Sequence, residues 1–330
     1  MPFKDIAGHA HVIDLLKQAV VRERVPQSLI FAGPDGVGKR VVAVALAQAL
    51  NCASRRDGDA CGVCSPCLRI GKGQYSDVTL LEKGEDASLK IRPVRERILD
   101  VIGYRPFEGK RRVFIIDPAD ELTIEAQDAL LKTLEEPPSA AIVILVTAYP
   151  DSLLATIQSR CRRLRFGPLT ETDVGRVLEK RNGLDAATAR RLAAMSAGSV
   201  SRALAEETGH LESDRDAAVA LLNAAKGGSI TVRLKAAQSL AQHGSKRRDR
   251  EAMADRLAML SSIIRDVVAI RAGSAAVLAN SDLEDTIRGL ERAFDVRRAD
   301  EAFAAVTRAA AALDRNASPK IVADWIAAKL

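Results

Sequence analysis

The segment from Gly33 to Arg40, GPDGVGKR, constrains the fold of this 330-residue chain more than any other feature. In the pattern G-x-x-x-x-G-K-[ST], which joins a strand to a helix, backbone N–H groups surround a phosphate and the lysine reaches its outer oxygens. The apolar run Ser28 to Ala32 precedes the segment and predicts a buried strand, and Lys39 to Leu50 has the apolar spacing of a helix. This order predicts a phosphate-binding loop rather than an ordinary glycine-rich turn, with binding residues Gly33, Gly36, Gly38 and Lys39.

Two positions depart from an active nucleotide-hydrolysing site. Arg40 stands where a Ser or Thr hydroxyl would bind Mg²⁺. The run Arg112 to Asp117, RVFIID, predicts a strand whose terminal acid matches one that holds Mg²⁺, although Asp117 could instead cap the following helix. Pro118 follows, where an active enzyme usually has a Glu that positions the attacking water. We therefore expect weak or absent ATP binding, and no ATPase activity from the isolated chain.

Four cysteines form a second motif, C-x8-C-x2-C-x2-C, at Cys52, Cys61, Cys64 and Cys67. In a reducing compartment such spacing indicates metal ligands rather than disulfides, and four thiolates suit tetrahedral Zn²⁺. A redox motif or free thiols are the alternatives. Because protein would fill all four positions, the predicted zinc is structural and not catalytic.

The composition is that of an ordinary globular protein, with 47% hydrophobic and 28% charged residues. Aromatic residues make up only 3%, which favours helical packing over a β-rich core. No apolar run approaches the ~20 residues of a membrane helix, and the polar N-terminus lacks the apolar region of a signal peptide. We predict a cytoplasmic protein without a membrane partner. The net charge of +6 permits weak contact with nucleic acid without demonstrating it.

The order of predicted elements indicates an α/β fold with three domains. Residues 1–168 alternate between helix and strand, which predicts a parallel sheet with helices on both faces. A small cysteine module, at about residues 52–67, is inserted there. Residues 169–208 predict a small helical lid, and residues 209–330 predict an all-helical domain for packing or assembly.

Further motifs indicate a family. They are DALLKTLEEPP at Asp128–Pro138, SRC at Ser159–Cys161, FKDIAGH at Phe3–His9 and PQSLIFAGP at Pro26–Pro34. Together with the four cysteines, they resemble the delta-prime subunits of the bacterial DNA polymerase III clamp loader, which are AAA+ proteins. The resemblance is dense over residues 1 to about 168 and becomes general helical similarity beyond about residue 205.

The resemblance implies a function and a set of partners. It implies a subunit that helps to load a sliding clamp onto primed DNA, within a hetero-pentamer of delta and gamma/tau type subunits that serves the replicative DNA polymerase. Residues 209–330 would form a collar that joins the subunits. Arg160 matches an arginine finger that enters the neighbouring subunit's ATP site, although it could merely belong to a basic surface. Thr147 matches the first sensor position, and Cys161 is expected to pack as a small buried residue.

One departure and two alternatives accompany this interpretation. Active relatives have a sensor arginine after a Gly-Ser pair, but here Ser201 takes that position and Arg202 is displaced by one. An active ATPase subunit of the same machine is the first alternative, and Arg40 and Pro118 argue against it. The second is a zinc-dependent nucleic-acid binding module. That module would have few cations beside its cysteines and no interleaved aromatic residues, the cations being Arg55, Arg56 and Arg69.

Overall fold

The computed structural model describes residues 1–82, 88–207, 210–227, 229–241, 246–273, 278, 280, 283–314 and 317–330. These residues form two compact units, Met1–Arg202 and Ala203–Leu330, which we describe separately. The predicted boundary between residues 208 and 209 lies outside the described residues. The division into three domains therefore stays a prediction.

A five-stranded parallel sheet organises the first unit, with the strand order β2-β3-β4-β1-β5. Every residue of the central strand β4 is buried, as expected for a parallel strand with both faces covered. The strands are β1 (Ser28–Ala32), β2 (Val78–Glu82), β3 (Arg112–Asp117), β4 (Ala141–Thr147) and β5 (Arg162–Arg165).

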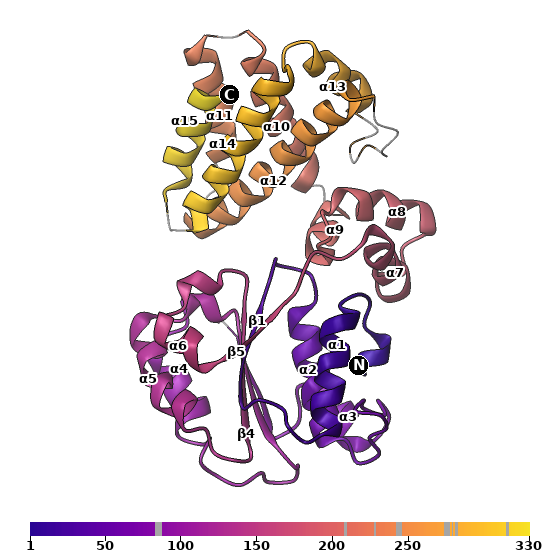
Figure 1. Cartoon of the computed structure of the whole chain (residues 1–330), viewed down its shortest axis with the longest axis vertical. Coiled ribbons are helices and arrows are strands. Elements are labelled where there is room, and N and C mark those ends of the chain that lie inside the picture. The colour runs from indigo at the N-terminus through magenta and orange to yellow at the C-terminus, as the bar shows by residue number, and fades with distance from the viewer. Residues whose placement is uncertain are drawn as a thin grey trace. The chain divides into compact units, whose positions relative to one another are not determined.

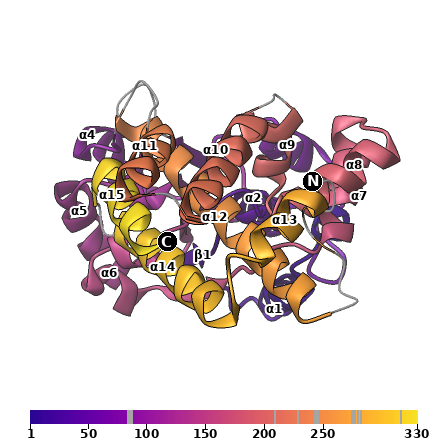
Figure 2. The same cartoon turned by 90° about the horizontal axis from the view of Figure 1, so that it is seen from above.

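Helices cover both faces of this sheet, so the predicted α/β fold class is confirmed (Figures 1 and 2). On one face lie α1 (Ala10–Val21), α2 (Lys39–Asn51) and α3 (Ser65–Gly71). On the other lie α4 (Ile91–Val94), α5 (Ile124–Glu135) and α6 (Ala155–Arg160). Short helical turns are η1 (Phe3–Asp5), the π-helical turn η2 (Arg95–Leu99), η3 (Ala119–Glu121) and η4 (Pro150–Ser152).

A hydrophobic core joins the sheet to the helices α4 to α6. It includes Phe114, Leu130 and Ile157, each at most 1% exposed. Cys161 is buried at the edge of this core, as predicted, and its burial raises the pKa of its thiol to about 12. The sheet and its covering helices thus fix the carboxyl ends of the strands, where the glycine-rich loop lies.

Three helices follow the sheet: α7 (Glu171–Asn182), α8 (Ala186–Met195) and α9 (Val200–Glu207). The Thr170 hydroxyl caps α7 by accepting from the backbone N–H of Asp173, and Asp185 caps α8. The start of α9 touches the glycine-rich loop, because the backbone N–H of Val200 donates to the Gly36 carbonyl at 2.9 Å. The last helix of the predicted lid therefore contacts the loop directly.

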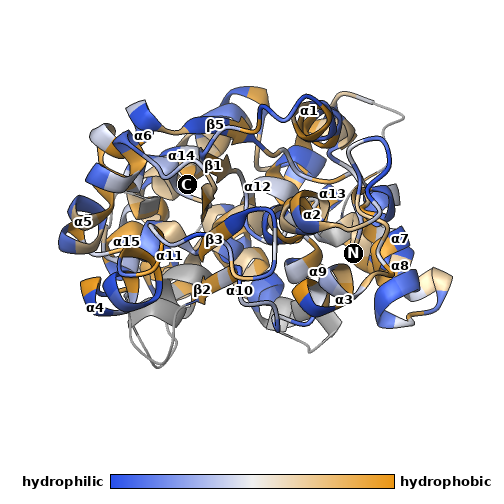
Figure 3. Cartoon of the chain, turned by 90° about the horizontal axis from the view of Figure 1, so that it is seen from below, coloured by the Kyte–Doolittle hydropathy of each residue, from blue (hydrophilic) through white to orange (hydrophobic). Residues whose placement is uncertain are grey.

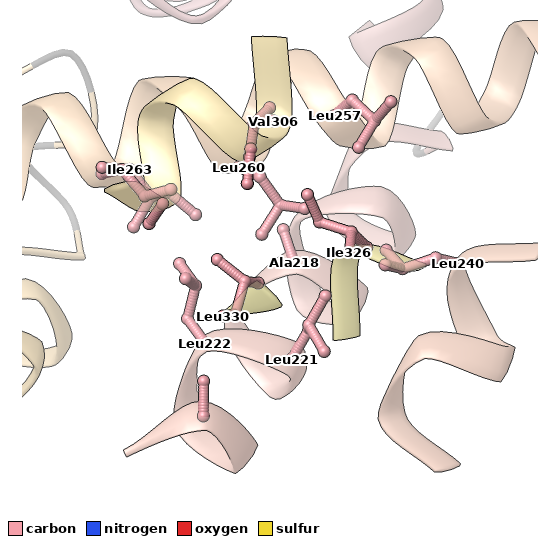
Figure 4. Close-up of a cluster of buried hydrophobic side chains, with 14 of the residues drawn as sticks. Ala218, Leu221, Leu222, Leu240, Leu257, Leu260, Ile263, Val306, Ile326 and Leu330 are labelled. Carbon is pink, nitrogen blue, oxygen red and sulfur yellow. The ribbon is translucent and has the colours of Figure 1, made fainter. Parts of the chain in front are cut away.

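The described part of the second unit contains helices and no strand. Its helices are α10 (His210–Ala225), α11 (Ile230–Ala241), α12 (Lys246–Arg271), α13 (Glu284–Glu291), α14 (Val296–Asp314) and α15 (Pro319–Lys329). Helix α11 packs against α15, and α12 packs against α14. Buried side chains from several helices meet in its core, among them Leu221, Leu260 and Ile326 (Figure 4).

The helices of both units carry hydrophobic residues alongside hydrophilic ones, as Figure 3 shows. Such helices bury their apolar face within their own unit and leave the other face to solvent. Among the described residues, no helix combines the length and apolar character that crossing a membrane requires.

Candidate nucleotide and metal sites

The glycine-rich loop has the backbone conformations that its glycines permit. Gly36 and Gly38 have φ angles of 73° and 98°, in the region that side chains other than glycine rarely adopt. A Cβ atom on Gly36 would collide with the side chains of Ser199 and Ser201. Gly36 therefore allows both the turn of the loop and the close approach of the segment that begins α9.

A cavity of about 460 Å³ lies beside this loop, within the first unit. Most of the predicted nucleotide-binding residues line it, namely Gly36, Gly38, Lys39, Arg40, Asp117 and Thr147. Gly33 does not, but its carbonyl accepts a hydrogen bond from Lys39 Nζ at 2.6 Å. Ser201 lines the cavity and Arg202 does not, in keeping with the displacement of Arg202 noted from the sequence.

The loop lysine is turned back onto its own loop. Lys39 is only 5% exposed, and its Nζ donates to the carbonyls of Gly33 and Pro34, the latter at 2.7 Å. Asp35 lies 3.5 Å from the same nitrogen. Burial lowers the pKa of Lys39, and the Asp35 carboxylate partly opposes that effect. A phosphate would have to exchange with these loop carbonyls to reach the lysine.

Arg40 contacts two carboxylates at the ends of neighbouring strands. Its Nη1 lies 2.5 Å from Glu82 Oε1, and its Nε lies 3.9 Å from Asp117 Oδ2. Glu82 and Asp117 are paired in the register of β2 and β3. Burial raises the pKa of Asp117 to about 6, although the nearby charges of Arg40 and Lys39 act in the opposite direction. The sequence analysis missed Glu82, and its position directly after the apolar run Val78–Leu81 was the available signal.

Thr147 is bonded to an acid of its own chain. Its hydroxyl donates to Asp120 Oδ1 at 2.7 Å, and the same oxygen accepts from the Ala148 backbone N–H at 3.1 Å. Pro118 lines the cavity in the place where a Glu was expected in an active enzyme, and Asp120 does not line it. The Asp120 carboxylate thus holds the end of β4, while the residue after Asp117 offers no acid.

Arg160 lies at the end of α6 and does not line the cavity of its own chain. Its side chain is 32% exposed, its Nε donates to Glu135 Oε1 at 2.8 Å, and its Nη1 donates to the Thr156 carbonyl at 2.8 Å. Glu135, which the sequence analysis did not single out, belongs to the LLKTLEEPP motif. The pair fixes the direction of a partly exposed guanidinium.

The four cysteines of the second motif come together in one cluster. All four Sγ atoms lie within 4.8 Å of one another, and those of Cys52 and Cys64 are 3.9 Å apart. Tetrahedral Zn²⁺ with Zn–S bonds of ~2.3 Å places its sulfurs about 3.8 Å apart, so the cluster fits such an ion. The cluster could therefore bind a metal.

The cysteine thiols differ in their acidity. The backbone N–H groups of Val63 and Cys64 lower the pKa of Cys61 to about 6, because they stabilise its thiolate. Burial raises the pKa values of Cys52 and Cys67. A positive ion at the centre would favour the thiolate form of all four.

The cysteine module and the end of α2 together hold the N-terminal segment. The Asp59 carboxylate accepts from the backbone N–H groups of Phe3 and Lys4 at 2.8 and 2.9 Å. Gln48 bonds both the N-terminal amine and the Cys67 carbonyl. The segment that these bonds position continues into the wall of the nucleotide-loop cavity, which includes Met1, Asp5, Ile6 and Ala7.

Comparisons with known proteins match the first half of the chain. A family model described as "DNA polymerase III, delta subunit" matches residues 8–170. The DNA polymerase III subunit tau/gamma of Haemophilus influenzae is 35% identical over 176 residues, and subunit tau of Bacillus subtilis is 35% identical over 177 residues. Over residues 8–170, about half of the chain, these matches support a DNA polymerase III clamp-loader subunit.

The matches cover 53% of this chain, but only 25% and 31% of those two relatives. They do not separate a delta-prime subunit from the gamma/tau type. The Bacillus subtilis DNA clamp loader delta protein aligns with 93% of this chain and 96% of its own, at 12% identity and a TM-score of 0.36. A TM-score that low informs neither fold nor function.

Proposed function

We propose that this chain is a non-hydrolysing, delta-prime type subunit of the clamp loader. It would act in a hetero-pentamer with delta and gamma/tau type subunits and help to place a sliding clamp on primed DNA. The observation that carries the proposal is the contact of Arg40 with Asp117 and Glu82. A guanidinium stands there where a hydrolysing subunit needs a metal-binding hydroxyl.

The loss of hydrolysis rests on two positions together. Arg40 has no oxygen that could ligate Mg²⁺, and Pro118 cannot orient a water molecule as a carboxylate does. Thr147 stands at the sensor position, but its hydroxyl donates a hydrogen bond to the Asp120 carboxylate. Weak nucleotide binding remains compatible with the loop and the cavity.

Arg160 gives this chain a role in a neighbour's catalysis. Because its guanidinium is partly exposed and lies outside its own cavity, it is available to a second subunit. A guanidinium supplied from outside neutralises the charge that develops on a transferred phosphoryl group. Glu135 would hold the side chain in place until the neighbour's phosphates compete for it.

The four cysteines would hold a structural Zn²⁺. The ion would supply a cross-link between the end of α2 and the start of α3, which a short module with little core of its own lacks. Its four protein ligands leave no position for a substrate, so its role would be confined to folding.

Arg160→Ala tests the role in trans. In clamp loaders rebuilt with this variant, assembly should be unchanged while ATP hydrolysis and clamp loading fall. An arginine finger is worth on the order of 10³–10⁵ in rate at its own site, but several sites contribute, so total hydrolysis should fall only a few-fold. The measurements are steady-state ATPase and clamp-loading rates.

Arg163→Ala is the matched control, since it removes an exposed arginine from the neighbouring strand β5. Rates equal to those of the unmodified loader are expected for it. If Arg160→Ala loaders also match the unmodified loader in both rates, Arg160 belongs only to a basic surface and the role in trans is lost.

A further inference from the structure

We propose that Arg40 replaces the divalent cation of the nucleotide site, so that the cavity binds the polyphosphate of a nucleoside di- or triphosphate without Mg²⁺. This inference deepens the proposed function, because it rests on the same degenerate nucleotide site. It concerns binding in this chain alone and needs neither hydrolysis nor a partner subunit.

The position of the guanidinium is the first argument. Arg40 sits between Glu82 and Asp117, whose carboxylates end two adjacent strands. Carboxylate oxygens in such a place are the ligands that Mg²⁺ prefers. A metal ion that used Asp117 would have to approach a fixed positive charge about 4 Å from the same oxygen, and like charges so close repel strongly in a partly buried site. The guanidinium therefore excludes the cation that it replaces.

The charge of the cavity lining is the second argument. Three cationic side chains, Lys39, Arg40 and Arg181, line the cavity, together with the three acids Asp5, Asp35 and Asp117. With all of them ionised, their charges cancel. A serine at position 40 would remove one of these positive charges and would make the lining less favourable to a polyphosphate without a bound cation. The positive charge of Arg40 thus favours the binding of an anion without a metal ion.

The hydrogen-bonding capacity of Arg40 is the third argument. A guanidinium has five N–H donors in a planar fork that matches phosphate geometry. Its contacts to Glu82 and Asp117 engage Nη1 and Nε and leave other donors. Its side chain is 44% exposed and lies on the cavity wall. Arg40 can therefore face the acids with one edge and a phosphate with another.

The size and the apolar wall of the cavity indicate the rest of the ligand. A volume of about 460 Å³ lies in the usual range of ~300–1,000 Å³ for small-molecule sites. Apolar side chains, which suit a base and a ribose, line it at Ile6, Val37, Leu169, Val177 and Val200. Lys39 has to release two loop carbonyls to meet a phosphate, which lowers the affinity without blocking the site.

Calorimetric titration of the purified chain with ADP and with ATP, in Mg²⁺ and in excess EDTA, tests the inference. For the unmodified chain we expect dissociation constants that differ by less than about threefold between the two buffers. Arg40→Ser, which restores a metal-binding hydroxyl, should bind at least about tenfold more weakly in EDTA than in Mg²⁺. Arg40→Lys keeps a positive charge and should stay independent of Mg²⁺, while Lys39→Ala should lose binding in both buffers.

Three results would overturn the inference: no binding of either nucleotide, at least about tenfold tighter binding by the unmodified chain in Mg²⁺, or Arg40→Ser binding that ignores Mg²⁺. The first two need only the unmodified chain, so a poorly folded variant cannot obscure them. None of these titrations involves Arg160, so a negative result here leaves the role in trans to be judged by the loader assays alone.

Discussion

At the scale of single residues, one buried carboxylate outside the candidate sites fixes the position of a loop. Asp77 has a fully buried side chain that accepts the backbone N–H groups of Phe107, Glu108 and Gly109 at 2.7 to 2.9 Å. Arg112 lies 3.6 Å away. One acid thus fixes the loop that leads into β3, the strand that ends at Asp117.

Asp77→Asn should destabilise the first unit by about 2 kcal/mol, because an amide cannot accept these donors as a carboxylate does. Chemical denaturation at neutral pH measures the loss. Asp14→Asn, which changes an exposed acid on α1, is the control and should stay within ~0.5 kcal/mol of the unmodified chain.

The same comparison should depend on pH. Burial alone would raise the pKa of Asp77, but the three N–H donors and Arg112 outweigh it and lower the pKa below its usual value. A lowered pKa stabilises the fold above the unfolded value of ~3.9, and that stability is lost as the pH falls through the folded pKa. The difference between Asp77→Asn and the unmodified chain should therefore shrink below about pH 4. A difference that stays constant down to acid unfolding would contradict the role of the charge.

At the scale of elements, the cysteine module connects α2 to α3 through a segment with little regular structure. Cys52 follows α2, and Cys64 directly precedes α3. Because no helix or strand lies between α2 and α3, we expect metal ligation to hold this connection together.

The purified chain should contain one equivalent of Zn²⁺, and Cys64→Ser should release it and lower the thermal stability of the first unit. Elemental analysis and thermal unfolding give the two readouts. Cys161→Ser is the matched control, because that thiol lies apart from the cluster and should leave the zinc content unchanged. Carefully prepared protein without zinc would rule out the assignment.

The sequence predicted these elements well where local pattern decides them. The strands Ser28–Ala32 and Arg112–Asp117 were predicted at the positions observed, because continuous apolar runs specify buried parallel strands. The strand β2, in contrast, ends on Glu82. A charged residue at the end of a strand carries no apolar signal.

The contacts within the site could not be predicted in the same way. The motif predicted that Lys39 contacts a phosphate. Its Nζ can instead donate to the carbonyls of its own loop, and the sequence alone does not decide between these two partners. The partners Glu82 of Arg40 and Glu135 of Arg160 lie 42 and 25 residues away in sequence. Only the packing of the sheet and its helices brings such residues together.

At the scale of the whole molecule, the chain joins a nucleotide-type fold to a separate helical unit whose described residues have an apolar core of their own. The proposed function gives the first unit the contacts with ATP sites and the second the task of assembly. On this proposal, the isolated chain is a subunit of an assembly and does not hydrolyse ATP by itself.

The isolated chain should accordingly hydrolyse ATP no faster than its Lys39→Ala variant, with or without primed DNA. The missing hydroxyl at Arg40 and the missing acid at Pro118 are the reasons. Phosphate release under saturating ATP is the measurement. Turnover that Lys39→Ala abolishes would show that both positions were misinterpreted and would favour an active ATPase subunit.

The bonds from the cysteine module to the N-terminal segment have a thermodynamic consequence. Asp59 and Gln48 hold residues 1–4, and the wall of the cavity begins with the same stretch of chain. If zinc orders this stretch, the nucleotide no longer has to supply that ordering free energy. By linkage, the nucleotide must then tighten the hold on zinc by the same factor. The affinity of each ligand would thus depend on the other, although the two do not touch and are linked only through the first residues of the chain.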